Sequence, residues 1–117
     1  MKVSELRPFA KKVSLTVKVA EKLETREVSS KLDNSSHRVT EAIVGDETGA
    51  ILLTLWDEAI DQVEEGKTYA IENAYTSLFK NSLRLNIGRF GKFQESKEKV
   101  KEVNKKNNLS EKELNVK

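Results

Sequence analysis

The feature that most constrains the fold is an alternation of apolar and polar side chains with a period of two residues. Between Val13 and Val19, every second residue is valine or leucine, and serine, threonine or lysine stands between them. Successive side chains of a β-strand point to opposite faces, so this pattern predicts a strand with one face in a core and the other in water. The stretch from Ile51 to Trp56 repeats the pattern, with isoleucine or leucine at positions 51, 53 and 55.

Five strands of this kind are predicted, and their order suits a small barrel. They cover residues 13–19, 39–44, 50–56, 68–74 and 82–87. Between the third and the fourth, Asp57–Glu65 has apolar residues spaced to cover one end of a barrel, which predicts a short helix or turn. Five strands with a small helical element in this place are typical of an OB-fold. The predicted fold class is therefore all-β, a five-stranded OB-fold barrel.

Two polar segments are predicted to connect the first three strands. Ser29–Arg38 contains a run of aspartate, asparagine and two serines, whose short polar side chains favour turns, so we expect a flexible hairpin tip. Gly45–Gly49 begins and ends with glycine, which tolerates a positive φ angle in a tight turn. A third loop, around Phe79–Asn81, joins the last two strands.

The end of the chain differs in composition from the rest. Residues 94–117 contain seven lysines and five glutamates but only five apolar residues, too few to build a core. We expect residues 1–93 to form one OB-fold nucleic-acid-binding domain. Residues 94–117 are predicted to be a charged tail, either flexible or a frayed helix.

The sequence argues against catalysis and against a membrane location. There is no cysteine, the one histidine is His37 in a polar segment, and no phosphate-loop or dinucleotide glycine pattern occurs. The adjacent acids Asp46 and Glu47 lie in a glycine-bounded turn rather than an apolar site. We therefore predict no enzyme activity, no metal and no cofactor. No apolar run is long enough to span a membrane, and Met1–Lys12 lacks a signal-peptide pattern, so a cytoplasmic, nucleoid-associated protein is expected.

Aromatic and basic residues coincide near the last two predicted strands. Trp56 ends the third strand on the face opposite its core residues, and Tyr75 and Phe79 flank the last connection. Bases stack on aromatic rings whatever their sequence, so these three rings are the predicted stacking residues of a single-strand groove. The alternative is that they pack in the core, as a lone aromatic ring usually does. The predicted phosphate contacts are Arg26, Lys31, Arg38, Lys80, Arg84, Arg89 and Lys92.

Four short stretches, in order along the chain, resemble archaeal single-stranded-DNA-binding proteins of the crenarchaeal type, which have a single OB-fold. The stretches are 42–49 (AIVGDETG), 53–56 (LTLW), 71–76 (IENAYT) and 85–88 (LNIG). The OB subunit of the metazoan single-stranded-DNA sensor complex is similar. The resemblance implies that Trp56, Tyr75 and Phe79 stack on bases. Tyr75 stands where crenarchaeal members have tryptophan, and the lysine-rich end departs from the glycine-rich or acidic tail usual in that family.

The function predicted from these residues is sequence-nonspecific binding of single-stranded DNA, which would protect strands in replication, repair or recombination. The tail is expected to contact DNA-processing proteins. Two alternatives stay open at this point. An RNA-binding or tRNA-binding OB module would use the same rings, because stacking does not distinguish the sugars. A protein-interaction OB subunit of a replication-protein-like complex would use the rings for assembly instead.

Overall fold

The computed structural model describes residues 1–29, 34–87 and 91–111. Its six strands are β1 (Val13–Ser29), β2 (Ser36–Asp46), β3 (Gly49–Trp56), β4 (Thr68–Phe79), β5 (Ser82–Asn86) and β6 (Lys92–Glu95). Helix α1 (Glu58–Gln62) lies between β3 and β4. Short 3-10 helices η1 (Val3–Glu5) and η2 (Lys105–Asn107) stand near the two ends of the chain. No helix in these ranges is both long enough and apolar enough to cross a membrane.

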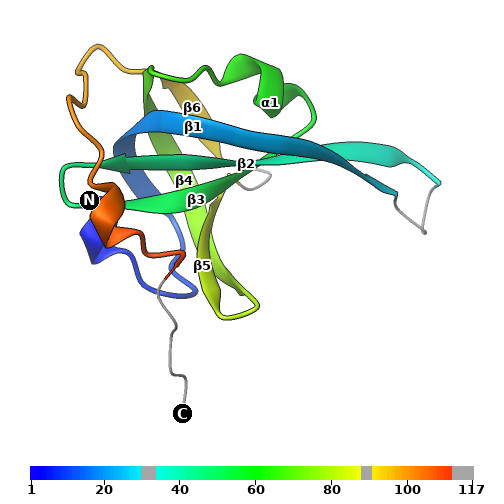
Figure 1. Ribbon diagram of the computed structural model, residues 1–117, viewed down its shortest axis with the longest axis horizontal. Helices are drawn as coiled ribbons and strands as arrows, with labels where there is room; N and C mark the ends of the chain where they lie inside the picture. The colour runs from blue at the N-terminus through cyan, green and yellow to red at the C-terminus, as the bar shows by residue number, and fades with distance from the viewer. Residues whose placement is uncertain (30–33, 88–90, 112–117) are drawn as a thin grey trace.

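Five of the strands close into a barrel (Figure 1). The strands follow the order β1-β2-β3-β5-β4, and pairing of β1 with β4 closes the ring. The β3–β5 pair is parallel, and the other pairs in the ring are antiparallel. Together with α1 between β3 and β4, this confirms the predicted five-stranded OB-fold. The sixth strand, β6, extends the sheet by pairing with β4 at residues 69–72.

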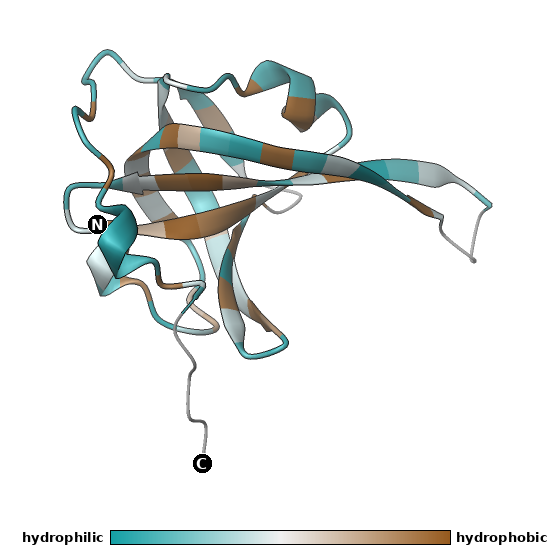
Figure 2. Cartoon of the chain, in the orientation of Figure 1, coloured by the Kyte–Doolittle hydropathy of each residue, from teal (hydrophilic) through white to brown (hydrophobic). Residues whose placement is uncertain are grey.

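The predicted alternation also places the core. On β3, Ile51, Leu53 and Leu55 are buried, whereas Trp56 on the other face is 47% exposed. Hydrophobic and hydrophilic residues alternate along β1 in the same manner (Figure 2). β3 and the first part of β1 therefore each have one face in the core and one face toward the outside.

The hairpin of β1 and β2 is longer than predicted. We expected a strand to Val19 and a polar connection over Ser29–Arg38, but β1 continues to Ser29 and β2 begins at Ser36. Backbone pairing runs to the end of this arm, where Ser29 is paired with Ser36, and the arm projects from the barrel (Figure 1). Its residues from 23 to 29 are exposed on both faces. With no core behind them they need no apolar alternation, so the pattern could not show this extension.

Gly45 and Gly49 have a different role from the one predicted. Among the described residues, the glycine with a positive φ is Gly66, at 86°. A Cβ atom on Gly45 would lie 2.2 Å from the Gly49 carbonyl oxygen and 2.9 Å from a methyl carbon of Val103. A Cβ on Gly49 would lie 2.9 Å from Asn107. Gly45 therefore allows close packing of the β2–β3 turn and of the C-terminal segment, and Gly49 allows close approach of that segment, rather than an unusual turn angle.

The segment after β6 packs along the barrel. The backbone N–H of Asn104 donates to the Asp46 carbonyl at 2.9 Å, and that of Leu109 donates to the Ala50 carbonyl at 2.8 Å. The Ser110 hydroxyl accepts a hydrogen bond from the Leu52 N–H at 2.8 Å and donates one to the Leu83 carbonyl. The expected tail or frayed helix is thus, up to residue 111, an irregular segment bound to β3 and β5. The boundary expected after residue 93 falls inside β6.

Candidate nucleic-acid interface

The outer face of β2, β3, β5 and β4 carries the three predicted stacking residues. Thr54 of β3 pairs with Asn86 of β5, which pairs with Tyr75 of β4. Cross-strand partners project from the same face, so Tyr75 and Trp56, two residues beyond Thr54, share the outer face. Phe79 lies farther along β4 on the same side. Trp56, Tyr75 and Phe79 are 47%, 42% and 52% exposed, so these rings are not core residues.

The spacing of the rings follows from the strand register. Residues along a strand rise by about 3.3 Å and neighbouring strands lie about 4.8 Å apart. Tyr75 and Phe79, four positions apart on β4, are therefore separated by about 13 Å. Trp56 is two strands and two positions from Tyr75, or about 12 Å away. The three rings define a track of about 25 Å across the sheet.

Two predicted cations lie beside the ring at one end of this track. The Lys80 ammonium is 5.5 Å from the centre of the Phe79 ring, and the Arg84 guanidinium carbon is 5.4 Å from it. Lys80 and Asn81 have φ angles of 50° and 65°, the conformation of a two-residue hairpin turn, which returns the chain beside Phe79. Arg84 also donates from Nε to the Ser82 hydroxyl at 3.1 Å. The structure thus brings Phe79, Lys80 and Arg84 together.

Arg26 also reaches this face, through an acid that the sequence reasoning missed. Arg26 pairs with Val39, and Val39 pairs with Trp56, so all three share the outer face of the sheet, although Val39 is covered there and only 4% exposed. A guanidinium nitrogen of Arg26 lies 3.5 Å from one carboxylate oxygen of Glu41. The other oxygen of Glu41 forms an ion pair with Arg84. The alternation of buried and less buried residues along β2 could have placed Glu41 on the outer face from the sequence alone.

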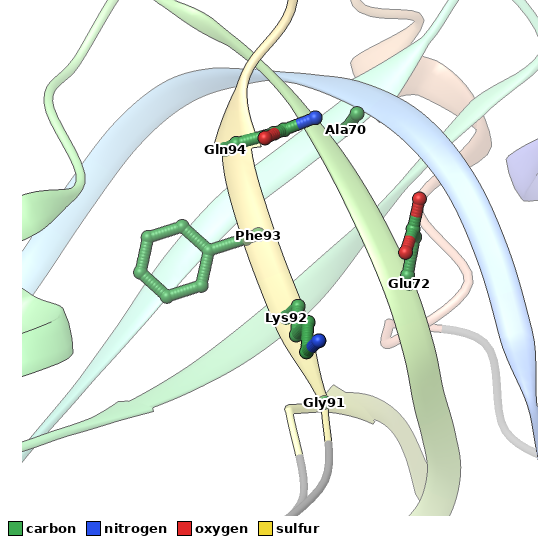
Figure 3. A pocket seen from close by; sticks show the side chains of 6 residues that line it. All are labelled: Ala70, Glu72, Gly91, Lys92, Phe93 and Gln94. Carbon is green, nitrogen blue, oxygen red and sulfur yellow. The ribbon is translucent and has the colours of Figure 1, made fainter.

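The remaining predicted cations do not join this cluster. Arg38 points to the opposite side of β2, where its guanidinium donates to Asp61 at 2.9 Å. This hydrogen bond and the attraction between the two opposite charges raise the pKa of Arg38 and lower the pKa of Asp61. Lys92 lies on β6 opposite Glu72 and lines a separate hollow of about 390 Å³ (Figure 3). Lys31 and Arg89 lie outside the described residues.

Phe93 and His37 have structural contacts of their own. In Figure 3 Phe93 points to the other side of β6 from Lys92, and its ring meets the Tyr69 ring edge-on at 6.0 Å. His37 Nδ1 lies 2.8 Å from an Asp57 carboxylate oxygen. The pKa of Asp57 is lowered by a hydrogen bond from the Arg38 backbone N–H and by this imidazole. Within residues 1–29, 34–87 and 91–111, no three acids or histidines gather as metal ligands would.

A closed five-stranded barrel with α1 between β3 and β4 is an OB-fold. Exposed rings and cations on one sheet face are typical of the OB-folds that bind oligonucleotides. More particularly, the chain belongs to the Ssb-like OB-fold family of single-stranded-DNA-binding proteins, whose family model matches residues 6–95. The proteins of this family bind nucleic acid and are not enzymes. Membership confirms the predicted relation to a single-OB, Ssb-like protein.

Similar proteins agree with this assignment. The chain is 42% identical over 97 residues to the single-stranded DNA binding protein Ssb of Saccharolobus solfataricus, and the match covers 83% of this chain but 64% of that relative. A hypothetical protein from Arabidopsis thaliana is 32% identical, with a TM-score of 0.84 over all of this chain and 86% of that one. The second OB-fold domain of replication protein A from Methanococcus maripaludis has a TM-score of 0.66 at 22% identity, over 86% of this chain and 98% of that domain, a likeness of fold.

Proposed function

We propose that this protein binds single-stranded DNA, without sequence specificity, on the outer face of β2, β3, β5 and β4. Trp56, Tyr75 and Phe79 would stack on bases, and Lys80, Arg84 and Arg26 would hold phosphates. The observation that carries the proposal is the exposure of three large rings on one face, between 42% and 52%. Burying one such ring would gain about 1.5 to 3 kcal/mol. A face that leaves three of them open beside cations is suited to a ligand with flat apolar faces and negative charges.

The floor between the rings supports this use. Leu52 and Ile43 are paired across β2 and β3 and are half-buried, which gives an apolar surface for sugars and base faces. Thr54 and Asn86 are neighbours on β3 and β5 and supply polar atoms beside Tyr75. Hydroxyl and amide groups accept and donate hydrogen bonds to the edges of several bases. Such a floor accommodates a strand without selecting one sequence.

DNA is the first ligand that we propose, because the Saccharolobus relative is named as a single-stranded-DNA-binding protein. The same rings would accept RNA, since base faces are common to both polymers. Competition between matched dT and rU oligonucleotides measures this preference. The proposed cellular role is protection of single strands at the nucleoid during replication, repair or recombination, with DNA-processing proteins as partners of residues 94–117. The relation to the metazoan sensor complex stays a prediction.

The proposal is tested by the anisotropy of a labelled oligo-dT strand, titrated with wild type and with Trp56→Ala, Tyr75→Ala and Phe79→Ala. Loss of one stacking ring should weaken binding by about 5-fold to 150-fold, since stacking contributes about 1 to 3 kcal/mol per base. Val28→Ala is the control, because Val28 is an apolar side chain that is 42% exposed but lies on β1 near the end of the arm, not on β2, β3, β5 or β4.

Unchanged affinity in all three ring variants would contradict the proposed site. If folded wild type bound no oligonucleotide at all, the protein-interaction alternative would take its place.

A further inference from the structure

One acid lies on the face proposed for the nucleic acid. Of the described outward-facing residues at positions 37–43, 52–56, 75–79 and 82–86, Glu41 is the one with a carboxylate. Its side chain is 20% exposed, so it belongs to the floor of the face and not to its rim. A negative charge on this face repels a polyanion, so Glu41 works against the binding of nucleic acid. Its position among the cations therefore calls for a reason.

Glu41 joins two of the proposed phosphate contacts from different strands. One carboxylate oxygen is 3.5 Å from a guanidinium nitrogen of Arg26 on β1, and the other is paired with Arg84 on β5. The Arg84 side chain is 15% exposed and that of Arg26 is 64% exposed. The Ser82 hydroxyl accepts a further hydrogen bond from Arg84 Nε at 3.1 Å. In the free protein, therefore, Arg84 already has an anion and an acceptor.

A carboxylate and a phosphate compete for the same donors. Each presents two negatively charged oxygen atoms that arginine can bind with two parallel N–H groups. Because this cluster is partly buried, salt screens its internal attraction less than it screens an exposed pair. A phosphate that takes the Arg84 donor now paired with Glu41 must thus replace that carboxylate, and the net gain in charge pairing is small.

We propose that Glu41 is a resident anion that occupies the phosphate-binding positions of Arg26 and Arg84 and so limits the affinity for single strands. The proposal rests on the function proposed above and assigns Glu41 a part in it. With Glu41 in place, the three side chains carry a net charge of one instead of two. Fewer counterions are then released on binding, which lowers the affinity and flattens its dependence on salt.

A purely positioning role for Glu41 has the opposite consequence. If Glu41 served to hold Arg84 ready for a phosphate, its removal would weaken binding. The sign of the change in affinity therefore distinguishes a competing anion from a positioning residue.

The test compares Glu41→Gln with wild type in oligo-dT anisotropy titrations between 50 and 300 mM salt. The gain of one net positive charge should steepen the plot of log K against log salt by about 0.7 and tighten binding about 5-fold at 0.1 M salt. Glu102→Gln is the matched control, because Glu102 is an exposed acid that lines a different hollow with Lys2 and Glu98. Glu102→Gln should stay within about twofold of wild type with an unchanged slope.

Weaker or unchanged binding by folded Glu41→Gln would overturn the proposal. A second variant keeps it testable if Glu41→Gln does not fold. Arg84→Gln should reduce the salt slope less than Lys80→Gln, because Arg84 already has its anion whereas the Lys80 ammonium faces the Phe79 ring. An equal or larger reduction for Arg84→Gln would also overturn it. Failure of wild type to bind oligo-dT would refute the proposed function itself, and this inference with it.

Discussion

Replacing Ser110 with alanine should destabilise the barrel, although Ser110 lies in the lysine-rich residues 94–117 that were expected to form a tail. Its hydroxyl bridges two strands, accepting from the Leu52 N–H on β3 at 2.8 Å and donating to the Leu83 carbonyl on β5. Ser110 is 6% exposed and Leu83 is 3% exposed, so water does not readily take the place of the hydroxyl. Ser110→Ala therefore leaves one donor and one acceptor without a partner.

The expected size of the effect follows from these two groups. An unsatisfied buried donor or acceptor costs about 1 to 3 kcal/mol. Because Leu52 is only half-buried, the two groups together should cost about 2 to 4 kcal/mol in the free energy of unfolding. For a domain of this size, that corresponds to a fall in Tm of about 10 to 20 °C.

Urea unfolding followed by Trp56 emission, with a thermal melt by circular dichroism, measures this loss. The matched control is Ser96→Ala, which removes an exposed hydroxyl that accepts only from the nearby Glu98 N–H at 3.1 Å. The control should stay within about 0.5 kcal/mol of wild type. If Ser110→Ala were as stable as the control, residues 96–111 would be a tail after all and the packing argued here would be wrong.

Three further outcomes are expected. Tyr75→Trp should tighten oligo-dT binding a few-fold in anisotropy titrations without a change in Tm, because it enlarges an exposed ring; weaker binding would contradict the stacking role. Gly45→Ala should cost about 1 to 3 kcal/mol or more in urea unfolding, because its Cβ would lie 2.2 Å from the Gly49 carbonyl oxygen; a neutral result would refute the close approach. The pKa of Asp57 lies below its ordinary value of 3.8, because the Arg38 N–H and an imidazole donate to its carboxylate. The ionised Asp57 carboxylate thus stabilises the fold above pH 3.8, and this contribution is lost as the pH falls through the lowered folded-state pKa. Asp57→Asn should therefore make the free energy of unfolding fall less steeply below about pH 4. An unchanged fall with pH would contradict this.

The strands that build the core could be predicted from the sequence. Burial on one face imposes the alternation seen from Ile51 to Trp56, and the same alternation placed Trp56 on the outer face. The arm of β1 and β2 could not be predicted in this way, because its pairing is a property of the backbone and its side chains lie in water.

The packing of the C-terminal segment was hidden for a related reason. Ser110 and Asn107 hold it through hydrogen bonds to backbone groups, at 2.8 Å from Leu52 N–H and from Thr48 O respectively. The tail was expected because the segment has few apolar residues, and a count of apolar residues cannot predict hydrogen bonds to backbone groups. Gly45 and Gly49 were noticed as glycines, yet part of the role of Gly45 and the role of Gly49 depend on a segment more than fifty residues away.

The candidate site divides in the same manner. The three rings and Lys80 could be selected by residue type, since their chemistry is intrinsic. Glu41 could not be selected by residue type, because its role depends on its ion pairs with Arg26 and Arg84, which lie on other strands. Arg38 was selected by charge alone and proves to face α1.

The central claim is that Trp56, the single tryptophan of the chain, lies at the bases of a bound single strand. Its intrinsic fluorescence should be followed during titration with oligo-dT at two salt concentrations, with duplex DNA as the control. We expect saturable quenching by the single strand, weakened at the higher salt, and little quenching by the duplex. Saturating binding in a parallel anisotropy titration with no change in Trp56 emission would contradict it.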